Sequence, residues 1–157
     1  MVLSGFGTVR ESDYVKSQYL YMRPRPILAV LGVVVLGLFV WAATMDSDPF
    51  IIIFLVVVAI FFAAYTPWSA KRTYRNYTAL SQPSKVEISD NGIFFESPTG
   101  SNLVPWSHFV KWRKNTELIL IFPTPRLFHL LPRHFFEDDA VFESVAKKIE
   151  ENLGVAT

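Results

Sequence analysis

The chain has 157 residues, enough for one ordinary domain, and its hydrophobic fraction is 51%. The absence of cysteine excludes a cysteine-ligated zinc site, and a formal net charge of +1 argues against a nucleic-acid-binding surface. Almost all charged residues lie before residue 26 or after residue 70, so the middle of the chain differs in character from both ends.

The N-terminal segment, residues 1–25, contains a short amphipathic pattern. In ESDYVKSQYLYM, the residues Val15, Tyr19 and Met22 recur at helical spacing, and Ser12 is placed to cap the first turn. The pattern predicts a cytoplasmic amphipathic helix. Two positions remain open for this helix. It lies on the surface of the membrane that residues 26–68 are predicted to cross, or it packs on the predicted cytoplasmic domain of residues 84–157 and ties that domain to the membrane.

Two long apolar runs follow, at residues 26–44 and 50–68, and only Asp46 and Asp48 carry charge between residues 26 and 70. Each run has about the ~20 residues that a membrane-spanning helix needs. A buried helical hairpin is disfavoured because neither run has a polar face. The sequence therefore predicts a transmembrane hairpin over residues 26–68, with Pro49 at the start of the second helix.

Basic residues flank the predicted hairpin, whereas its four-residue link has none. The flanking residues nearest the membrane are Arg23, Arg25, Lys71, Arg72 and Arg75. The positive-inside rule then predicts a multi-pass protein with both termini in the cytoplasm, and the two aspartates mark the outer turn. The same basic residues are expected to attract anionic membrane lipids.

A linker over residues 69–83 leads into a predicted domain over residues 84–157. Its segments KVEIS, IFFES, NLVPWSHF, ELILIF and RLFHLL predict about five antiparallel strands. The Asn-Gly pair predicts a hairpin turn with positive φ at both central residues, and Pro105 predicts an edge strand or a bulge. A final helix is expected over residues 138–152, with Val145 and Ile149 on its apolar stripe and Gly154 as its C-cap.

The order of these segments resembles the bacterial YcxB-like family over nearly the whole chain. The motifs that carry the resemblance are ISDNGI, PWS and LLPRHFF, followed by an acidic helix. The resemblance implies an α+β membrane protein of the bacterial inner membrane, in which a two-helix transmembrane hairpin precedes a small pleckstrin-homology-like (PH-like) sheet domain capped by a C-terminal helix. It supplies no catalytic residues.

We find no residues in the sequence suited to catalysis, cofactor binding or metal binding. The histidines His108, His129 and His134 lack the spacing of a metal site. Ser107 precedes a histidine, but it lacks the flanking glycines of a nucleophile elbow. We therefore expect a protein that is not an enzyme and that binds no cofactor.

Basic residues of the domain are the candidate binding site for a protein partner or a lipid headgroup. They are Lys111, Arg113, Lys114, Arg126 and Arg133, which an antiparallel sheet could bring to one rim. The alternative is that they are ordinary solubilising charges, which would move the partner site to the aromatic surface near Tyr74 and Tyr77.

The predicted function is that of a membrane-anchored, non-catalytic binding module that holds a protein partner or lipid headgroup at the inner face of the membrane. The alternative function is immunity or resistance, in which the protein neutralises a toxin by direct binding. Membrane lipids and a protein partner, either an adaptor target or a toxin, are the expected partners; nucleic acid is not, and homo-oligomer formation is left open.

Overall fold

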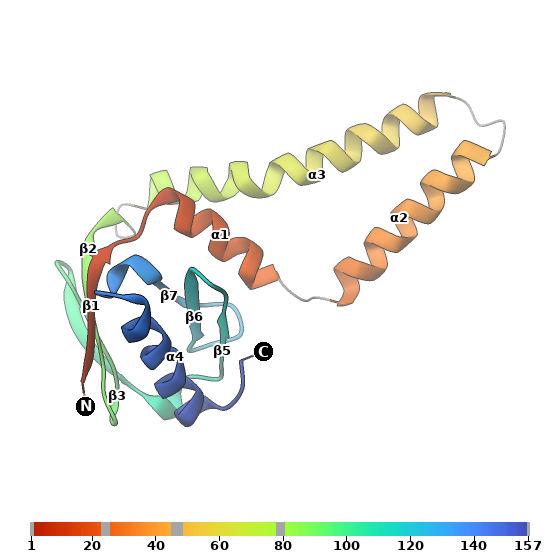
Figure 1. Ribbon diagram of the computed structural model, residues 1–157. Helices are drawn as coiled ribbons and strands as arrows, with labels where there is room; N and C mark the ends of the chain where they lie inside the picture. Colours follow the sequence, from red (N-terminus) through yellow and green to blue (C-terminus); the bar gives the residue numbers. More distant parts are fainter. Residues whose placement is uncertain (1, 23–25, 45–48, 78–80, 157) are drawn as a thin grey trace. The chain divides into compact units, whose positions relative to one another are not determined.

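The computed structural model describes residues 2–22, 26–44, 49–77 and 81–156 (Figure 1). The chain divides into two compact units. We call residues 22–70 the helical unit, and residues 1–21 together with 71–157 the sheet unit. The two ends of the chain therefore belong to one unit, and the apolar middle forms the other.

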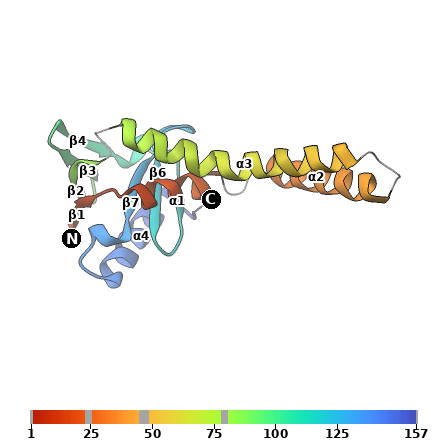
Figure 2. The ribbon, with the colours of Figure 1, turned by 90° about the horizontal axis from the view of Figure 1, so that it is seen from above.

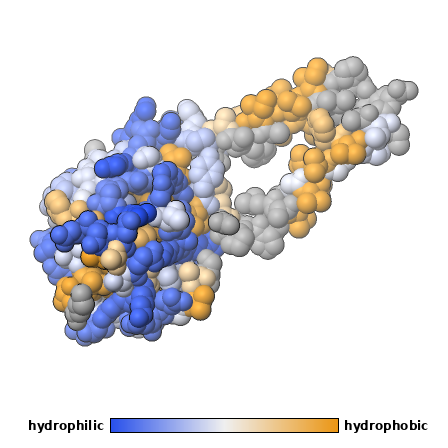
Figure 3. Space-filling view, viewed as in Figure 1, coloured by the Kyte–Doolittle hydropathy of each residue, from blue (hydrophilic) through white to orange (hydrophobic). Residues whose placement is uncertain are grey.

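The helical unit contains α2 (Pro26–Thr44) and most of α3 (Pro49–Asn76). Pro49 is the first residue of α3, as predicted, because a helix needs no amide donor at that position. The helix then continues past residue 68, through Lys71 and Arg72, to a point inside the predicted linker. Many described apolar side chains of this unit are exposed, and Figure 3 shows them as a largely hydrophobic surface.

The transmembrane prediction is wrong. Within the described ranges, the search for a helix with both the length and the apolar character to cross a bilayer finds none. The finding corrects the α+β membrane class, the transmembrane hairpin and the multi-pass inner-membrane location with cytoplasmic termini.

The sheet unit is an α+β structure with two antiparallel sheets. The first sheet has the order β1 (Leu3–Thr8), β2 (Pro83–Ile88), β3 (Gly92–Ser97) and β4 (Gly100–Pro105), and the second has the order β5 (Lys111–Lys114), β6 (Leu118–Phe122) and β7 (His129–Pro132). Helix α1 (Glu11–Met22) follows β1, and short 3₁₀ turns cover Trp106–His108 and Arg133–Phe135. Helix α4 (Asp139–Leu153) ends the unit and contacts β1 and β5, one strand of each sheet. In Figure 2, α4 and β4 lie on opposite sides of the unit.

The prediction of a single sheet with about five strands is corrected to two sheets, and the predicted segments include neither β5 nor β1. The β1 segment, LSGFGT, has glycines at two inward positions. A Cβ on Gly5 would come 2.7 Å from the Phe136 ring, and one on Gly7 would come 2.5 Å from the Phe135 ring. The glycines make room for these rings, but they also remove the β-branched and aromatic residues by which a strand is recognised.

The hairpin between β2 and β3 forms where Asn-Gly predicts it, with Ile88 opposite Ile93. Its turn type differs from the prediction, because among the described residues only glycines have positive φ, and here that residue is Gly92 at +148°. Pro105 ends β4, which is an edge strand of its sheet, as predicted. A proline suits this position because it has no amide donor for a further ladder bond.

The main core lies between the sheets and α4. Ile88, Ile93 and Ile121 from the strands meet Val145 and Ile149 of α4, and all five side chains are fully buried. The predicted apolar stripe of α4 is thereby confirmed. The helix has the predicted ends as well, since the Asp138 side chain accepts a hydrogen bond from the amide of Val141 and Gly154 is the C-cap.

Helix α1 packs on the sheet unit, which decides between the two positions left open for it. Leu20 is buried with Leu118, Leu120 and Phe122 in a second apolar cluster. The ring of Tyr21 stacks on Phe122 with centroids 6.0 Å apart. Ser12 is not the N-cap, because α1 begins at Glu11.

The first turn of α1 is capped from within the helix instead. The carboxylate of Asp13 accepts a hydrogen bond of 2.9 Å from the amide of Arg10. This is the backward half of a capping box, in which a side chain of the first turn satisfies an otherwise unpaired amide.

Candidate functional site

A pocket of about 480 Å³ opens in the sheet unit, within the size range of small-molecule sites. Its walls come from the β1–α1 junction, α1, the end of α3, β2, β3 and the loop that leads into β7. The lining residues are Val9, Tyr14, Thr73, Tyr77, Gln82, Ser84, Val86, Phe95 and residues 126–130. The pocket therefore depends on segments from both ends of the chain.

The inner wall of the pocket is apolar and aromatic. Val86 is 2% exposed, and the Phe95 ring stacks on the His129 imidazole with centroids 4.2 Å apart and an angle of 20°. Burial lowers the pKa of His129, because the charged imidazolium loses hydration there. His129 is therefore neutral at pH 7, and it brings a flat ring to the wall rather than a charge.

Polar groups are few in the interior of the pocket. Burial raises the pKa of the Tyr14 phenol, so this side chain keeps its proton. The Oε1 atom of Gln82 is buried and has no hydrogen-bond partner in the described part of the chain. The nearby Tyr74 hydroxyl is occupied, since it donates a bond of 2.6 Å to the carbonyl of Val9.

One of the predicted binding cations lies at the pocket. Arg126 is exposed in the loop between β6 and β7 and lines the pocket. Across the described ranges, no hydrogen bond or ion pair engages its guanidinium group. The other four predicted cations each have an internal contact.

Lys111 and Lys114 lie at opposite ends of β5. Lys111 is opposite Phe122 in the register, and its Nζ atom lies 4.8 Å from the centroid of that ring. Lys114 is opposite Ile119 and forms an ion pair with Glu143 of α4. Both lysines therefore help to hold neighbouring elements.

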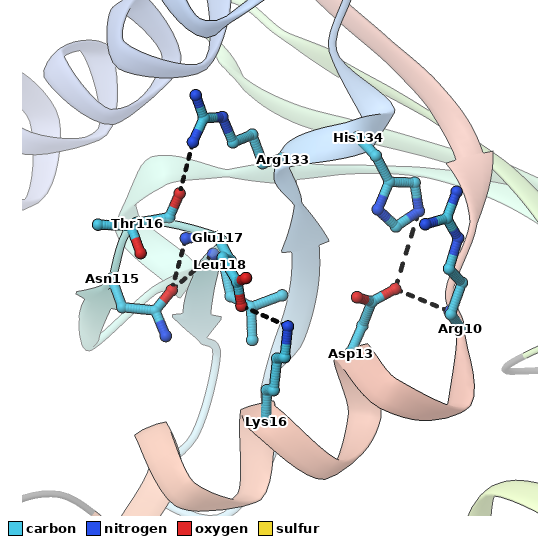
Figure 4. A network of polar contacts seen from close by, with 9 residues as sticks. All are labelled: Arg10, Asp13, Lys16, Asn115, Thr116, Glu117, Leu118, Arg133 and His134. Atoms are coloured by element: carbon cyan, nitrogen blue, oxygen red, sulfur yellow. Dashed lines mark hydrogen bonds and ion pairs between the residues drawn. The ribbon is translucent and has the colours of Figure 1, made fainter.

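The two arginines have similar internal roles. Arg113 donates from Nη1 to the carbonyls of Leu20 at 3.0 Å and Tyr21 at 2.6 Å, at the C-terminal end of α1. Arg133 forms an ion pair with Asp139 and donates to the carbonyl of Thr116 at 3.3 Å (Figure 4). A cation at a helix C-terminus satisfies carbonyls that have no intrahelical donor.

The register places the predicted binding residues at opposite ends of the second sheet, with Lys111 and Arg126 at one end and Lys114 and Arg133 at the other. Arg126 lies in the loop that leaves β6 at the Lys111 end of the sheet, whereas Arg133 follows the end of β7 that pairs with Leu118, near Lys114. The side chain of Arg113 points to α1 between them. The structure thus brings only Arg126 to the pocket.

Three of the five residues predicted to lie near a membrane are among the described residues. Arg23 and Arg25 lie outside the described residues. Lys71 and Arg72 are exposed on α3, and the Nε atom of Arg75 lies 3.2 Å from a carboxylate oxygen of Glu11. The contact of Arg75 fixes the end of α3 to the start of α1 within the sheet unit.

Away from the pocket, a cluster of polar contacts joins α1 to the edge of the second sheet (Figure 4). The Nε2 atom of His134 lies 3.2 Å from the carbonyl oxygen of Thr8 and 3.8 Å from a carboxylate oxygen of Asp13. Lys16 forms an ion pair of 2.6 Å with Glu117. These contacts bridge elements, and no trio of potential metal-binding side chains is found among the described residues.

Sequence reasoning missed most of the pocket. Gln82, Ser84 and Phe95 carry no motif, and the sequence around His129 gives no sign of its stacking partner. One useful signal was the aromatic pair near the linker, because Tyr77 lines the pocket and Tyr74 holds the adjacent strand end.

Comparison with known proteins adds one match. The family model described as YcxB-like protein matches residues 88–147, which run from the end of β2 into α4. The match contains all three motifs that indicated this family, and it confirms the resemblance over these residues. No curated protein and no solved structure matches the chain.

Proposed function

We propose that this protein is a non-catalytic binding module and that the sheet unit holds its ligand in the pocket. The observation that carries the proposal is the pairing of an uncharged, largely apolar interior with an unengaged cation at Arg126. Pockets with these properties are the default binding sites of small organic molecules.

The chemistry of the walls favours a small ligand with a flat apolar body and one acidic group. The stacked rings of Phe95 and His129 offer a planar surface at the inner wall. The guanidinium of Arg126 matches the geometry of a carboxylate, with which arginine makes paired hydrogen bonds. The partner class proposed here is thus an amphipathic organic acid, and the toxin-neutralising role stays a prediction.

The absence of a catalytic role is part of the proposal. A general base must lie within hydrogen-bond reach of the group that it deprotonates. Among the described residues, no hydrogen bond connects His129 to a carboxylate or a hydroxyl group. Its partly buried, neutral ring is suited to stacking.

The test uses the full chain and two probes with the same ring system, 2-naphthoate and 2-naphthamide. Binding is followed by protein NMR, so that each shifted amide reports its own position. We expect 2-naphthoate to shift the amides of Ser84, Phe95 and His129. Arg126→Gln should weaken this binding about fivefold, the upper range for an exposed ion pair, and should leave 2-naphthamide unaffected.

Lys147→Gln is the matched control, because it removes one exposed positive charge from α4, away from the pocket. This variant should bind both probes as the wild type does. Shifts confined to other parts of the chain, or equal losses in the two variants, would contradict the proposed site.

A further inference from the structure

Among the described residues, β4 forms the one sheet edge that is neither charged nor covered by another element. Proteins protect edge strands with charged side chains, short strands, prolines or a covering element, because a free edge can pair with another chain. Strand β1, at the other edge of the first sheet, is contacted by α4 and by the 3₁₀ turn Arg133–Phe135. In the second sheet, β5 carries three cations, and β7 has four residues and ends on Pro132.

Strand β4 has almost none of this protection. Its six residues, GSNLVP, include no charged side chain, and the proline stands only at the last position. Five of the six residues are exposed, and Figure 2 shows β4 on the side of the unit opposite to α4. Its neighbour in the sheet is β3. Because ladder bonds alternate along an antiparallel strand, β3 pairs with only part of the amides and carbonyls of β4, and the others face outward.

An apolar pair lies beside this edge, on the face of the sheet that points away from the core. Leu103 is opposite Phe94 in the register. Their chain neighbours Ile93 and Val104 belong to the core cluster, so the alternation of a strand directs Leu103 and Phe94 to the other face. Leu103 is 48% exposed, and Phe94 is partly buried. The edge therefore presents backbone groups for pairing together with an apolar side chain.

We infer that the outer edge of β4 is a self-association surface, on which β4 of a second copy of this chain pairs in the antiparallel direction about a two-fold axis. In such a pair each strand donates to and accepts from the other, so one surface serves both copies. The two four-stranded sheets then form one continuous sheet. The Leu103 side chain of the second copy extends the apolar pair of the first.

The distribution of charge favours a second copy as the occupant. An uncharged strand meets no like charge when it pairs with itself. The first charged side chain behind β4 on this face is Glu96 of β3, which is opposite Ser101. It stands three strand spacings, about 14 Å, from its counterpart in the second copy. That separation exceeds the screening length of about 8 to 10 Å at physiological salt, so the two carboxylates do not oppose the pairing.

The test uses the absence of cysteine from the full-length chain, because one introduced thiol can then be cross-linked only to a second copy. A short bismaleimide linker joins thiols that lie opposite or diagonal to each other on paired strands, about 5 to 8 Å apart. Asn102→Cys should cross-link at least about tenfold faster than Val155→Cys, because the dimer holds its thiols at a high effective concentration. Val155 is the control because it is 78% exposed and lies outside the sheets.

Charges at Leu103 supply the second half of the test, in the Asn102→Cys background. Leu103→Lys and Leu103→Glu should each slow the cross-linking about fivefold, because like charges then meet on facing strands. An equimolar mixture of the two should cross-link faster than either alone, because Lys then faces Glu. Phe6→Lys, a change of the same kind at a 65% exposed side chain of β1, should leave the rate unchanged.

Three results would overturn the inference. Equal rates for Asn102→Cys and Val155→Cys would place any association on another surface, such as the exposed apolar side chains of α2 and α3, or would show a monomer whose edge is free for the strand of a different protein. Unchanged cross-linking in both Leu103 variants would exclude pairing along β4. A mixture without rescue would show that the losses come from damage to the fold and not from repulsion between strands.

Discussion

Replacing Arg113 by methionine should destabilise the sheet unit by about 2 to 3 kcal/mol. The guanidinium makes two charge-assisted bonds, of 3.0 Å to Leu20 and 2.6 Å to Tyr21, and bonds of this type contribute about 1.5 to 3 kcal/mol each when partly buried. Methionine keeps much of the apolar stem, and water can reach part of the freed carbonyls, so we expect less than the full sum. Lys111→Met is the control, because its contact over the Phe122 ring is worth about 0.5 to 1 kcal/mol.

The assay is urea unfolding followed by tryptophan fluorescence. In a background in which Trp41 and Trp68 are phenylalanine, the signal comes from Trp106 and Trp112, which both belong to the sheet unit. With a slope of about 2 kcal/mol per molar urea, the midpoint for Arg113→Met should fall by about 1 M. If the two variants unfolded within about 0.5 kcal/mol of each other, Arg113 would not be holding α1, and its assignment to ligand binding would have to be reopened.

Three further predictions concern stability. Ile149→Ala should lower the free energy of unfolding by about 2 to 4 kcal/mol because Ile149 is 0% exposed. Lys147→Ala should change it by less than about 0.5 kcal/mol. Equal melting temperatures for the two variants would contradict the core position of Ile149. Gly92→Ala should lower the free energy of unfolding by about 3 kcal/mol, and Gly100→Ala by only about 1 kcal/mol. Both glycines have positive φ, but only at Gly92 would a Cβ meet a backbone oxygen, at 2.2 Å. A lower urea midpoint for Gly100→Ala than for Gly92→Ala would refute this reasoning. The pKa of His129 is lowered in the folded state, so the unfolded chain takes up the extra proton at a higher pH than the folded chain does. The free energy of unfolding should therefore fall as the pH drops below about 6.5. Urea titrations at successive pH values should show a smaller decline for His129→Phe.

Local chemistry was enough to predict several elements correctly. The acidic residues before α4, its apolar stripe and the glycine after it predicted the helix, because caps and periodicity act over a few neighbouring residues. The Asn-Gly pair placed the β2–β3 hairpin for the same reason. The turn type was not predicted correctly, since the register Ile88↔Ile93 leaves more residues in the connection than a two-residue turn would use.

Long-range pairing decided the features that the sequence did not show. Strand β1 forms because Leu3 pairs with Ile88, a residue far from it in the sequence. Its glycines are explained only by the rings of Phe135 and Phe136, which lie against them. The apolar runs predicted a transmembrane hairpin from composition alone. The described parts of α2 and α3 do not have the combination of length and apolarity that this requires.

The candidate site shows the same division. From the sequence alone, Arg113, Lys114, Arg126 and Arg133 are equivalent surface cations, and nothing in their neighbours separates them. Contacts with distant elements engage three of them and leave Arg126 at a pocket whose other walls come from both ends of the chain. The sequence by itself determined the C-terminal helix, the place of the hairpin and the family motifs, because their causes are local. Only the tertiary structure decided which charges contact other elements and which one lines the pocket, because these contacts depend on the partners that folding brings to each charge.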